Sequence, residues 1–201
     1  MKIFMSFINN LKVFFRYIYK SKWKIKLPKK NKFILVDGDY NPFEKYIKKK
    51  DITVLYRRGE EINLNILLKC LFKLKFSTLD YCDEFIRYVS PKLILTAFDY
   101  HTIFYKLSKK TGIKTLMLQK AQRGNTSGII SNSDYYFPKN SKNFFYVDYV
   151  LLYNEAVRKF YSKRISGNFF EIGSFENNFN KISSKRQKKE IVFISNYSHS
   201  T

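Results

Sequence analysis

The chain has 201 residues, of which 45% are hydrophobic and 18% aromatic. This length and composition are typical of one folded domain with a substantial core, and they argue against a disordered chain and against two full domains. The formal net charge is +22, from 38 Lys and Arg against 16 Asp and Glu. Such a charge attracts nucleic acid, anionic lipid and phosphorylated substrates alike. Because its lysines are scattered along the chain, as an AT-rich coding sequence would also supply them, the charge alone does not select a partner.

The first 30 residues predict an amphipathic basic helix. Apolar side chains from Phe4 to Ile18 recur at helical spacing, with Lys12 and Arg16 between them. Residues 1–26 either lie at an anionic membrane surface or pack on the domain. No segment approaches the roughly 18 to 20 uninterrupted apolar residues that span a bilayer. We therefore expect a cytoplasmic protein, which in the first case is peripheral at the inner face of the plasma membrane.

After this segment, short apolar runs alternate with helical patterns. Strands are predicted at 33–36, 52–56, 92–96, 114–118, 148–152 and 169–172, and helices at 41–49, 63–72, 79–89, 100–110 and 154–163. Gly112 and Gly167 are predicted to stop helices, and the long polar segment 119–142 is typical of a functional or mobile loop. The alternation predicts an α/β, Rossmann-like domain over residues 31–180, with a mostly parallel sheet and helices on both faces.

Cysteine and histidine are too few for a structural metal site. Cys70 and Cys82 lie among apolar residues of predicted helices, which indicates reduced core thiols in a cytosolic protein. With only His101 and His199 as further ligands of this kind, we expect no metal centre. The sequence also contains none of the short motifs of dinucleotide binding, P-loop, serine-hydrolase or zinc-protease sites.

Polar residues follow each predicted strand, and in an open parallel sheet this is where ligands bind. Because the carboxyl ends of parallel strands meet at one edge, these side chains should share a rim. They are Asp37, Gly38, Asp39, Arg57, Arg58, Glu60, Asp99, His101, Gln119, Arg123, Gly173 and Ser174.

Three sets of residues at this rim suggest chemistry, and each also has a simpler structural interpretation. Asp37 and Asp39 resemble the Asp-x-Asp that holds a divalent ion against a sugar nucleotide, but an Asp-Gly turn that ends a strand is the commoner explanation of this pattern. Asp99 is either a helix N-cap or, with His101, a candidate general base for an acceptor hydroxyl. Arg123 suits phosphate or carboxylate, or is a solvated loop charge.

Six segments extend these observations beyond single residues. They are RRGEEINLNILL (57–68), PKLILTAFDYHTIFYKL (91–107), IKTLMLQKAQRG (113–124), VDYVLLYNEAVRKFY (147–161), FFEIGSFENNF (169–179) and EIVFIS (190–195). In this order they resemble bacterial surface carbohydrate biosynthesis proteins, including capsular polysaccharide proteins, which are similar to two-lobed GT-B glycosyltransferases. Where the family tends to read Gln-Asn-Gly followed by Arg, Gln119 and Arg123 match, whereas Lys120 and Ala121 replace the Asn and the Gly.

The resemblance implies a two-lobed enzyme that transfers a glycosyl or related group to a glycan or lipid-linked acceptor. Residues 31–180 would form the acceptor-side lobe, and residues 181–201 a linker and the first strand of a second lobe that binds a nucleotide-activated sugar. No cofactor is then expected in this stretch, which alone would be inactive. His101 or Asp99 would act as base, while Asp37, Asp39, Gln119, Arg123, Gly173 and Ser174 would bind substrate.

Two other functions remain open at this point. The positive charge and tyrosines beside lysines, such as Tyr135 and Tyr136, favour a basic nucleic-acid-binding module. No recognised module is present, so we expect no specific nucleic acid. The N-terminal segment instead favours a non-catalytic, membrane-peripheral scaffold of a capsule assembly complex.

Overall fold

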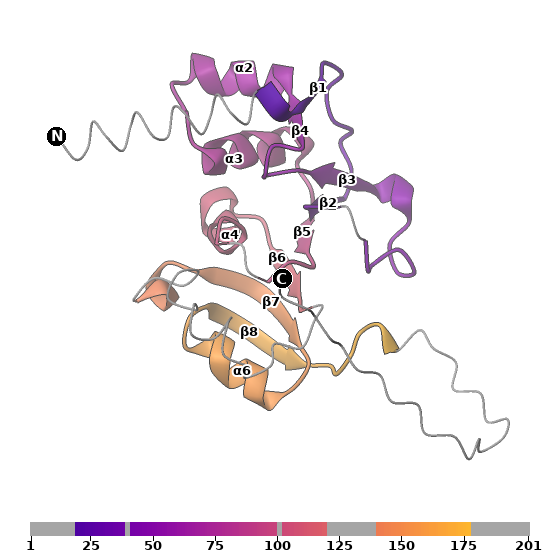
Figure 1. Ribbon diagram of the computed structural model, residues 1–201, viewed down its shortest axis with the longest axis vertical. Coiled ribbons are helices and arrows are strands. Elements are labelled where there is room, and N and C mark those ends of the chain that lie inside the picture. Colours follow the sequence, from indigo (N-terminus) through magenta and orange to yellow (C-terminus); the bar gives the residue numbers. More distant parts are fainter. Residues whose placement is uncertain (1–18, 39–40, 100–101, 120–139, 178–201) are drawn as a thin grey trace, which may run out of the picture.

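A computed structural model describes residues 19–38, 41–99, 102–119 and 140–177. Its main sheet has six strands, all parallel, in the order β3-β2-β5-β6-β7-β8 (Figure 1). The α/β, Rossmann-like fold that the sequence predicts is therefore confirmed. The strands are β2 (Phe33–Val36), β3 (Ile52–Leu55), β5 (Leu93–Thr96), β6 (Thr115–Leu118), β7 (Tyr146–Leu152) and β8 (Ser166–Glu171).

The helices begin at side-chain caps that are visible in the sequence. The side chains of Asn63, Ser77 and Asn154 each accept a hydrogen bond from a backbone N–H in the first turn. Gly112 ends a helix in the left-handed conformation, as predicted. The elements are α2 (Leu64–Phe72), α3 (Thr78–Val89), α4 (Phe104–Thr111), α6 (Glu155–Ser162) and the 3-10 turns η1 (Lys49–Asp51) and η2 (Ser141–Asn143).

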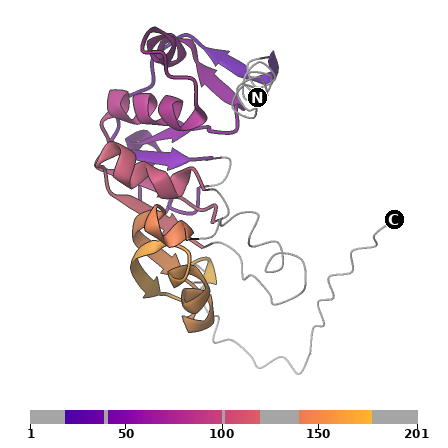
Figure 2. The same ribbon diagram turned by 90° about the vertical axis from the view of Figure 1, so that its left-hand side faces the viewer.

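The described helices contribute to one face of the sheet, and the strand order explains why. From β3 onward each connection moves in the same direction across the sheet, so right-handed crossovers place α2, α3, α4 and α6 on the same side. Figures 1 and 2 show α2, α3 and α4 along this side. The larger core cluster there joins Ile34, Ile94 and Met117 of the sheet to Ile86 of α3 and Phe104 of α4.

The opposite face is reached by the connection from β2 to β3, which runs the other way. A helix was predicted over 41–49, but residues 42–46 form turns, followed by η1. Phe43 belongs to the smaller core cluster on this face, and Phe175 packs against that cluster. The ring centroids of the two residues lie 5.9 Å apart. Within the described part of the chain, helices thus cover one face rather than both. An Asx turn, in which Asn41 accepts from Phe43 N, takes the place of the predicted helix cap.

Two further predictions of local structure are wrong. Gly167 does not stop a helix: α6 ends at Ser162, and Gly167 lies within β8 opposite a register shift at Val147. The helix predicted from residue 100 begins at Phe104. In both places nonlocal pairing and packing, which a local pattern does not show, determine the boundary.

A second, two-stranded parallel sheet was not predicted. β1 (Lys22–Lys24) pairs with β4 (Glu61–Asn63), with Trp23 opposite Ile62. β1 falls inside the predicted N-terminal helix of residues 1–30, so that helix does not continue to residue 30. The alternation Lys-Trp-Lys-Ile-Lys-Leu over 22–27 is the strand signal that helical spacing over the preceding residues obscured.

Both cysteines are free thiols buried in the core, as predicted. Burial raises the pKa of Cys70 to about 11 and that of Cys82 to about 12, so at pH 8 almost no reactive thiolate exists in the folded protein.

We expect a thiol-reactive chromophore to label neither residue of the folded protein within minutes at pH 8. Both residues should react in about 6 M guanidinium, a concentration that unfolds most domains of this size. Fast stoichiometric labelling of the folded chain would contradict this packing, and Cys82→Ala should halve the signal in denaturant.

Across the residues that the structure describes, no helix is long and apolar enough to cross a membrane.

Candidate functional site

The strand order creates one topological switch point, between β2 and β5. The chain leaves β2 toward β3 on one side and returns to β5 on the other, so the connections diverge above the carboxyl ends of these two strands. Val36 and Thr96, the last residues of the two strands, are paired neighbours. In open parallel sheets the crevice formed in this way is the usual ligand site. Asp37 and Asp99 lie one and three residues beyond these two strand ends.

Asp37 leaves β2 in the left-handed conformation, with φ of 56°, and its side chain is held by the neighbouring strand. Its Oδ2 accepts from Nε of Arg57 at 2.5 Å, and its Oδ1 accepts from the Arg57 backbone N–H at 3.2 Å. The side chains are 1% and 6% exposed, respectively, so the pair is buried. Asp37 thus ties the end of β2 to the residues after β3, and its carboxylate is already neutralised by a guanidinium.

Arg57 has donors beyond those that Asp37 uses. Its Nη2 is buried and has no hydrogen-bond partner among the described residues. The next residue, Arg58, forms an ion pair with Glu60 at 2.7 Å and lies 5.7 Å from the ring centroid of Phe98, on the loop after β5. A guanidinium with a donor to spare suits an anionic oxygen such as that of a phosphate or a carboxylate. The switch point therefore carries two arginines, one of them with an unsatisfied donor.

Asp99, on the loop after β5, is buried and does not cap a helix. Its Oδ2 accepts from the Tyr161 hydroxyl of α6 at 2.6 Å, and its backbone carbonyl accepts from the Tyr105 hydroxyl of α4. Since α4 begins at Phe104, the N-cap interpretation of Asp99 is wrong. Tyr161 is a partner that sequence reasoning missed, because it lies 62 residues away on a helix with no motif of its own. The contacts fix the chain two residues before His101.

Gln119 follows β6 and is buried at the same edge. Its backbone N–H donates to the Leu151 carbonyl at 2.9 Å, which extends the β6–β7 pairing by one residue. Its Oε1 accepts from Tyr153 N at 3.2 Å. The side-chain amide therefore bridges the ends of two neighbouring strands, and it fixes the point from which the following segment departs.

Gly173 and Ser174 follow the last strand. Gly173 has φ of 70°, and a Cβ built there would meet nothing within 4 Å, so the turn needs glycine for its backbone conformation and not for space. The Ser174 carbonyl accepts from Asn177 N at 3.2 Å. These residues reach the carboxyl edge at the outer strand, several strands from the switch point.

The described candidate residues lie at one edge of the sheet, as predicted, because every strand is parallel. With neighbouring strands about 4.8 Å apart, Asp37 and Gln119 belong to strands separated by about 10 Å. Asp39, His101 and Arg123 lie outside the described residues, as do Lys120 and Ala121. No cluster of three His, Cys, Asp or Glu side chains that could hold a metal ion occurs in the described ranges.

This edge combines a buried carboxylate at the end of β5 with guanidinium groups at the end of β3. Such an arrangement can orient a neighbouring base and neutralise an anionic substrate group. It supplies no cysteine nucleophile, because Cys70 and Cys82 lie in the core. The described residues of this edge thus suit the binding of an anionic group.

Comparison with protein families finds a match to the second half of the chain. Residues 116–201 match a family described as "putative O-antigen biosynthesis protein". The matched stretch begins in β6 and includes Gln119, Gly173 and Ser174, but it covers less than half of the chain. No curated protein and no solved structure matches the chain.

Proposed function

We propose that this protein acts in surface polysaccharide biosynthesis, and that it transfers a glycosyl or related group from a nucleotide-activated donor to a glycan or lipid-linked acceptor. The observation that carries the first part is the match of residues 116–201 to a family named for O-antigen biosynthesis. The second part draws support from the all-parallel sheet, whose switch point gathers arginines and a buried carboxylate at its carboxyl edge.

His101 is the base that we assign to the acceptor hydroxyl, since its unperturbed pKa lies near neutrality. Asp99 is the second candidate, but its carboxylate already accepts from Tyr161, which suits it better to holding the loop that carries His101. Arg57 and Arg123 supply guanidinium donors for a phosphate or carboxylate of the substrate. Asp37, Asp39, Gln119, Gly173 and Ser174 complete the proposed substrate-binding rim.

The described domain would form the acceptor side of the cleft. A second lobe, whose first strand would be residues 190–195, would bind most of the nucleotide-activated donor. In such a division, positive groups and helix N-termini stabilise the leaving phosphate while the first lobe holds the acceptor. A membrane-facing position of the first lobe would give it access to a lipid-linked acceptor.

The test is complementation of a gene deletion in the source bacterium with parent and variant genes. We expect His101→Ala and Asp99→Asn to reduce surface polysaccharide at least about tenfold, a threshold below the roughly 10²- to 10⁴-fold that a positioned general base contributes to the rate. Immunoblots should confirm equal protein levels, and Lys163→Ala, an exposed lysine after α6, is the control that keeps the parent profile. If both rim variants restored the parent profile at equal abundance, the assigned roles would be wrong. If the deletion left surface polysaccharide unchanged, the biosynthetic role itself would fail.

A further inference from the structure

α2 presents apolar side chains on both of its faces. Ile66, Leu67 and Cys70 pack into the core, as an amphipathic helix requires. The outer face should then be polar, yet Leu68 and Phe72, one helical turn apart, are exposed. Phe72 is 86% exposed, although phenylalanine is among the side chains most often buried.

The exposed apolar surface continues through the turn between α2 and α3. Leu74 and Phe76 are 78% and 50% exposed, and with Leu68 and Phe72 they form what we term the α2 tip. At the other end of α2, Asn65 donates to the Ile25 carbonyl at 2.6 Å, which places the exposed Ile25 beside the same helix. A contiguous exposed patch of this kind marks an interaction surface in a folded protein.

The backbone conformation of Leu74 is a second, independent observation that stability alone does not explain. Lys75 N donates to the Cys70 carbonyl at 2.9 Å, and Leu74 has φ of 54°, so the helix ends in a Schellman motif with leucine at the position usually taken by glycine. A leucine there is strained and, being exposed, gains no packing in return. The fold alone would favour glycine at this position.

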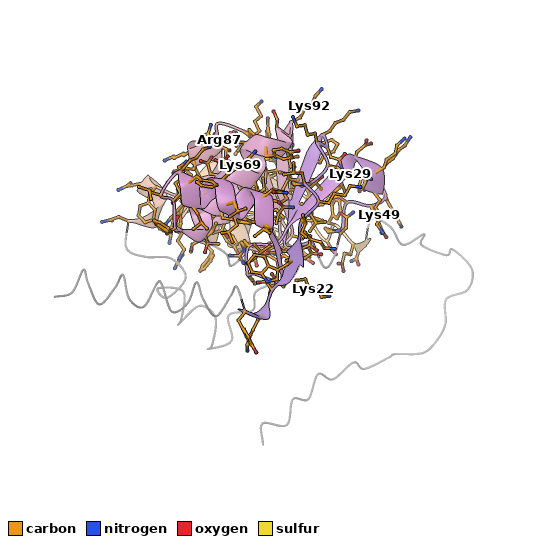
Figure 3. All side chains as sticks on the ribbon, turned by 90° about the horizontal axis from the view of Figure 1, so that it is seen from above. Lys22, Lys29, Lys49, Lys69, Arg87 and Lys92 are labelled. Carbon is orange, nitrogen blue, oxygen red and sulfur yellow. The ribbon has the colours of Figure 1, made fainter. Side chains whose placement is uncertain are left out.

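Basic side chains surround the patch. Lys69, Lys73 and Lys75 alternate with its apolar residues, and Lys22 and Lys24 lie on the adjacent β1. Three of these lysines form ion pairs with nearby acids: Lys73 with Glu84, Lys75 with Asp83, which also pairs with Arg87, and Lys24 with Glu61. The cations still outnumber these acids, because Lys22, Lys69 and Arg87 add to the three paired lysines. Figure 3, which looks at this end of the molecule, shows Lys22, Lys69 and Arg87 from three different elements. The field around the patch is therefore positive.

We propose that the α2 tip inserts into the interfacial region of a bilayer that contains anionic lipid, with the surrounding lysines at headgroup level. Exposed apolar side chains that alternate with lysines match such a surface, in which the acyl boundary accepts the former and the headgroups the latter. A protein partner with an apolar groove would satisfy the phenylalanines but would leave the surrounding lysines without acceptors unless it were also acidic. The proposal depends on described residues alone, so it is independent of residues 1–18 and of the transferase assignment.

The experiment is co-sedimentation of the full chain with phosphatidylcholine vesicles that either contain or lack phosphatidylglycerol. A phosphatidylglycerol fraction of about 30% gives the vesicles a negative surface potential, as the anionic lipids of a cytoplasmic leaflet do. We expect binding to the anionic vesicles only, weakened by salt. The triple variant Phe72→Ser/Leu74→Ser/Phe76→Ser should bind at least about tenfold more weakly. The matched control Phe144→Ser/Phe170→Ser, which removes two exposed aromatics elsewhere on the domain, should bind within about twofold of the parent.

Leu74→Gly separates membrane binding from folding. Glycine relieves the left-handed strain, so its melting temperature should equal or exceed that of the parent while its vesicle affinity falls. Trp23, the single tryptophan of the chain, is partly exposed on β1, and its emission should shift to the blue on binding. Parent-like binding by the triple variant, or no binding of the parent to anionic vesicles, would overturn the proposal. Concentration-dependent dimerisation that the triple variant abolishes, without vesicle binding, would assign the patch to a protein interface instead.

Discussion

Replacing Arg57 by methionine should lower the free energy of unfolding by about 3–5 kcal/mol, the cost of leaving a buried charge without its partner. The Asp37 carboxylate is 1% exposed and, among the described residues, would keep the Arg57 backbone N–H as its donor, since the 2.5 Å contact to Nε would be gone. Urea denaturation followed by circular dichroism measures the change. A loss below about 1 kcal/mol, the value of an exposed pair, would show that Asp37 is hydrated and that the rim is open there.

The double variant Asp37→Asn/Arg57→Met is the matched control. Asparagine keeps the shape of Asp37 and tolerates its φ of 56°, so only the charge is removed. Because both charges are then absent, the double variant should be more stable than Arg57→Met alone. Equal destabilisation of the single and double variants would instead mean that Arg57 acts through packing.

Gly167→Ala should have a similar or larger effect on stability. Gly167 has φ of 147°, and a Cβ there would lie 1.8 Å from the Val147 carbonyl oxygen, which is backbone and cannot rotate away. Backbone strain and overpacking each cost about 1–3 kcal/mol, so we expect a loss of about 3–5 kcal/mol or failure to fold. Solubility on expression and urea denaturation measure these outcomes.

Gly112→Ala separates strain from steric overlap. Gly112 also has a positive φ, of 74°, but a Cβ there would meet nothing within 4 Å. Its replacement should cost only about 1 kcal/mol, the usual penalty for alanine in the left-handed region. If Gly167→Ala were no more destabilising than Gly112→Ala, the register shift between β7 and β8 would not be as tight as the structure has it.

The six strands of the main sheet could be predicted because each contains a short apolar run, which is almost continuously buried in β2, β5 and β6. β8, at the edge of the sheet, shows the weakest signal, since its apolar run is short and its residues stay partly exposed. Helix starts at Asn63 and Asn154 were equally readable, since a cap and its N–H partner lie three residues apart. β1 and β4 were missed because each has three residues and is stabilised by a strand far away in sequence. Residues 42–46 form turns instead of the predicted helix, and Asn41, which the pattern indicates as a helix cap, closes an Asx turn with Phe43 N.

In the candidate site, too, local patterns predicted some features and missed others. That its polar residues share one edge follows from the parallel strand pattern and could be predicted. The pairing of Asp37 with Arg57, and of Asp99 with Tyr161, could not be, because each contact joins different elements and neither changes a local pattern. The two contacts are nevertheless what distinguishes a buried structural carboxylate from one that is open to a ligand.

The central claim is that the carboxyl edge of the sheet binds substrate during surface polysaccharide synthesis. Its most direct test is transfer of label from radiolabelled nucleotide sugars into the lipid and glycan fractions of membranes from cells that express the full-length protein. Variants of the proposed base and of the proposed anion-binding arginine, His101→Ala and Arg123→Ala, are compared with Lys32→Ala and Lys92→Ala, exposed residues that precede β2 and β5 at the opposite edge. We predict at least about tenfold loss of transfer for the first pair and none for the other pair. Equal transfer by all four variants, or loss confined to the opposite edge, would contradict the claim.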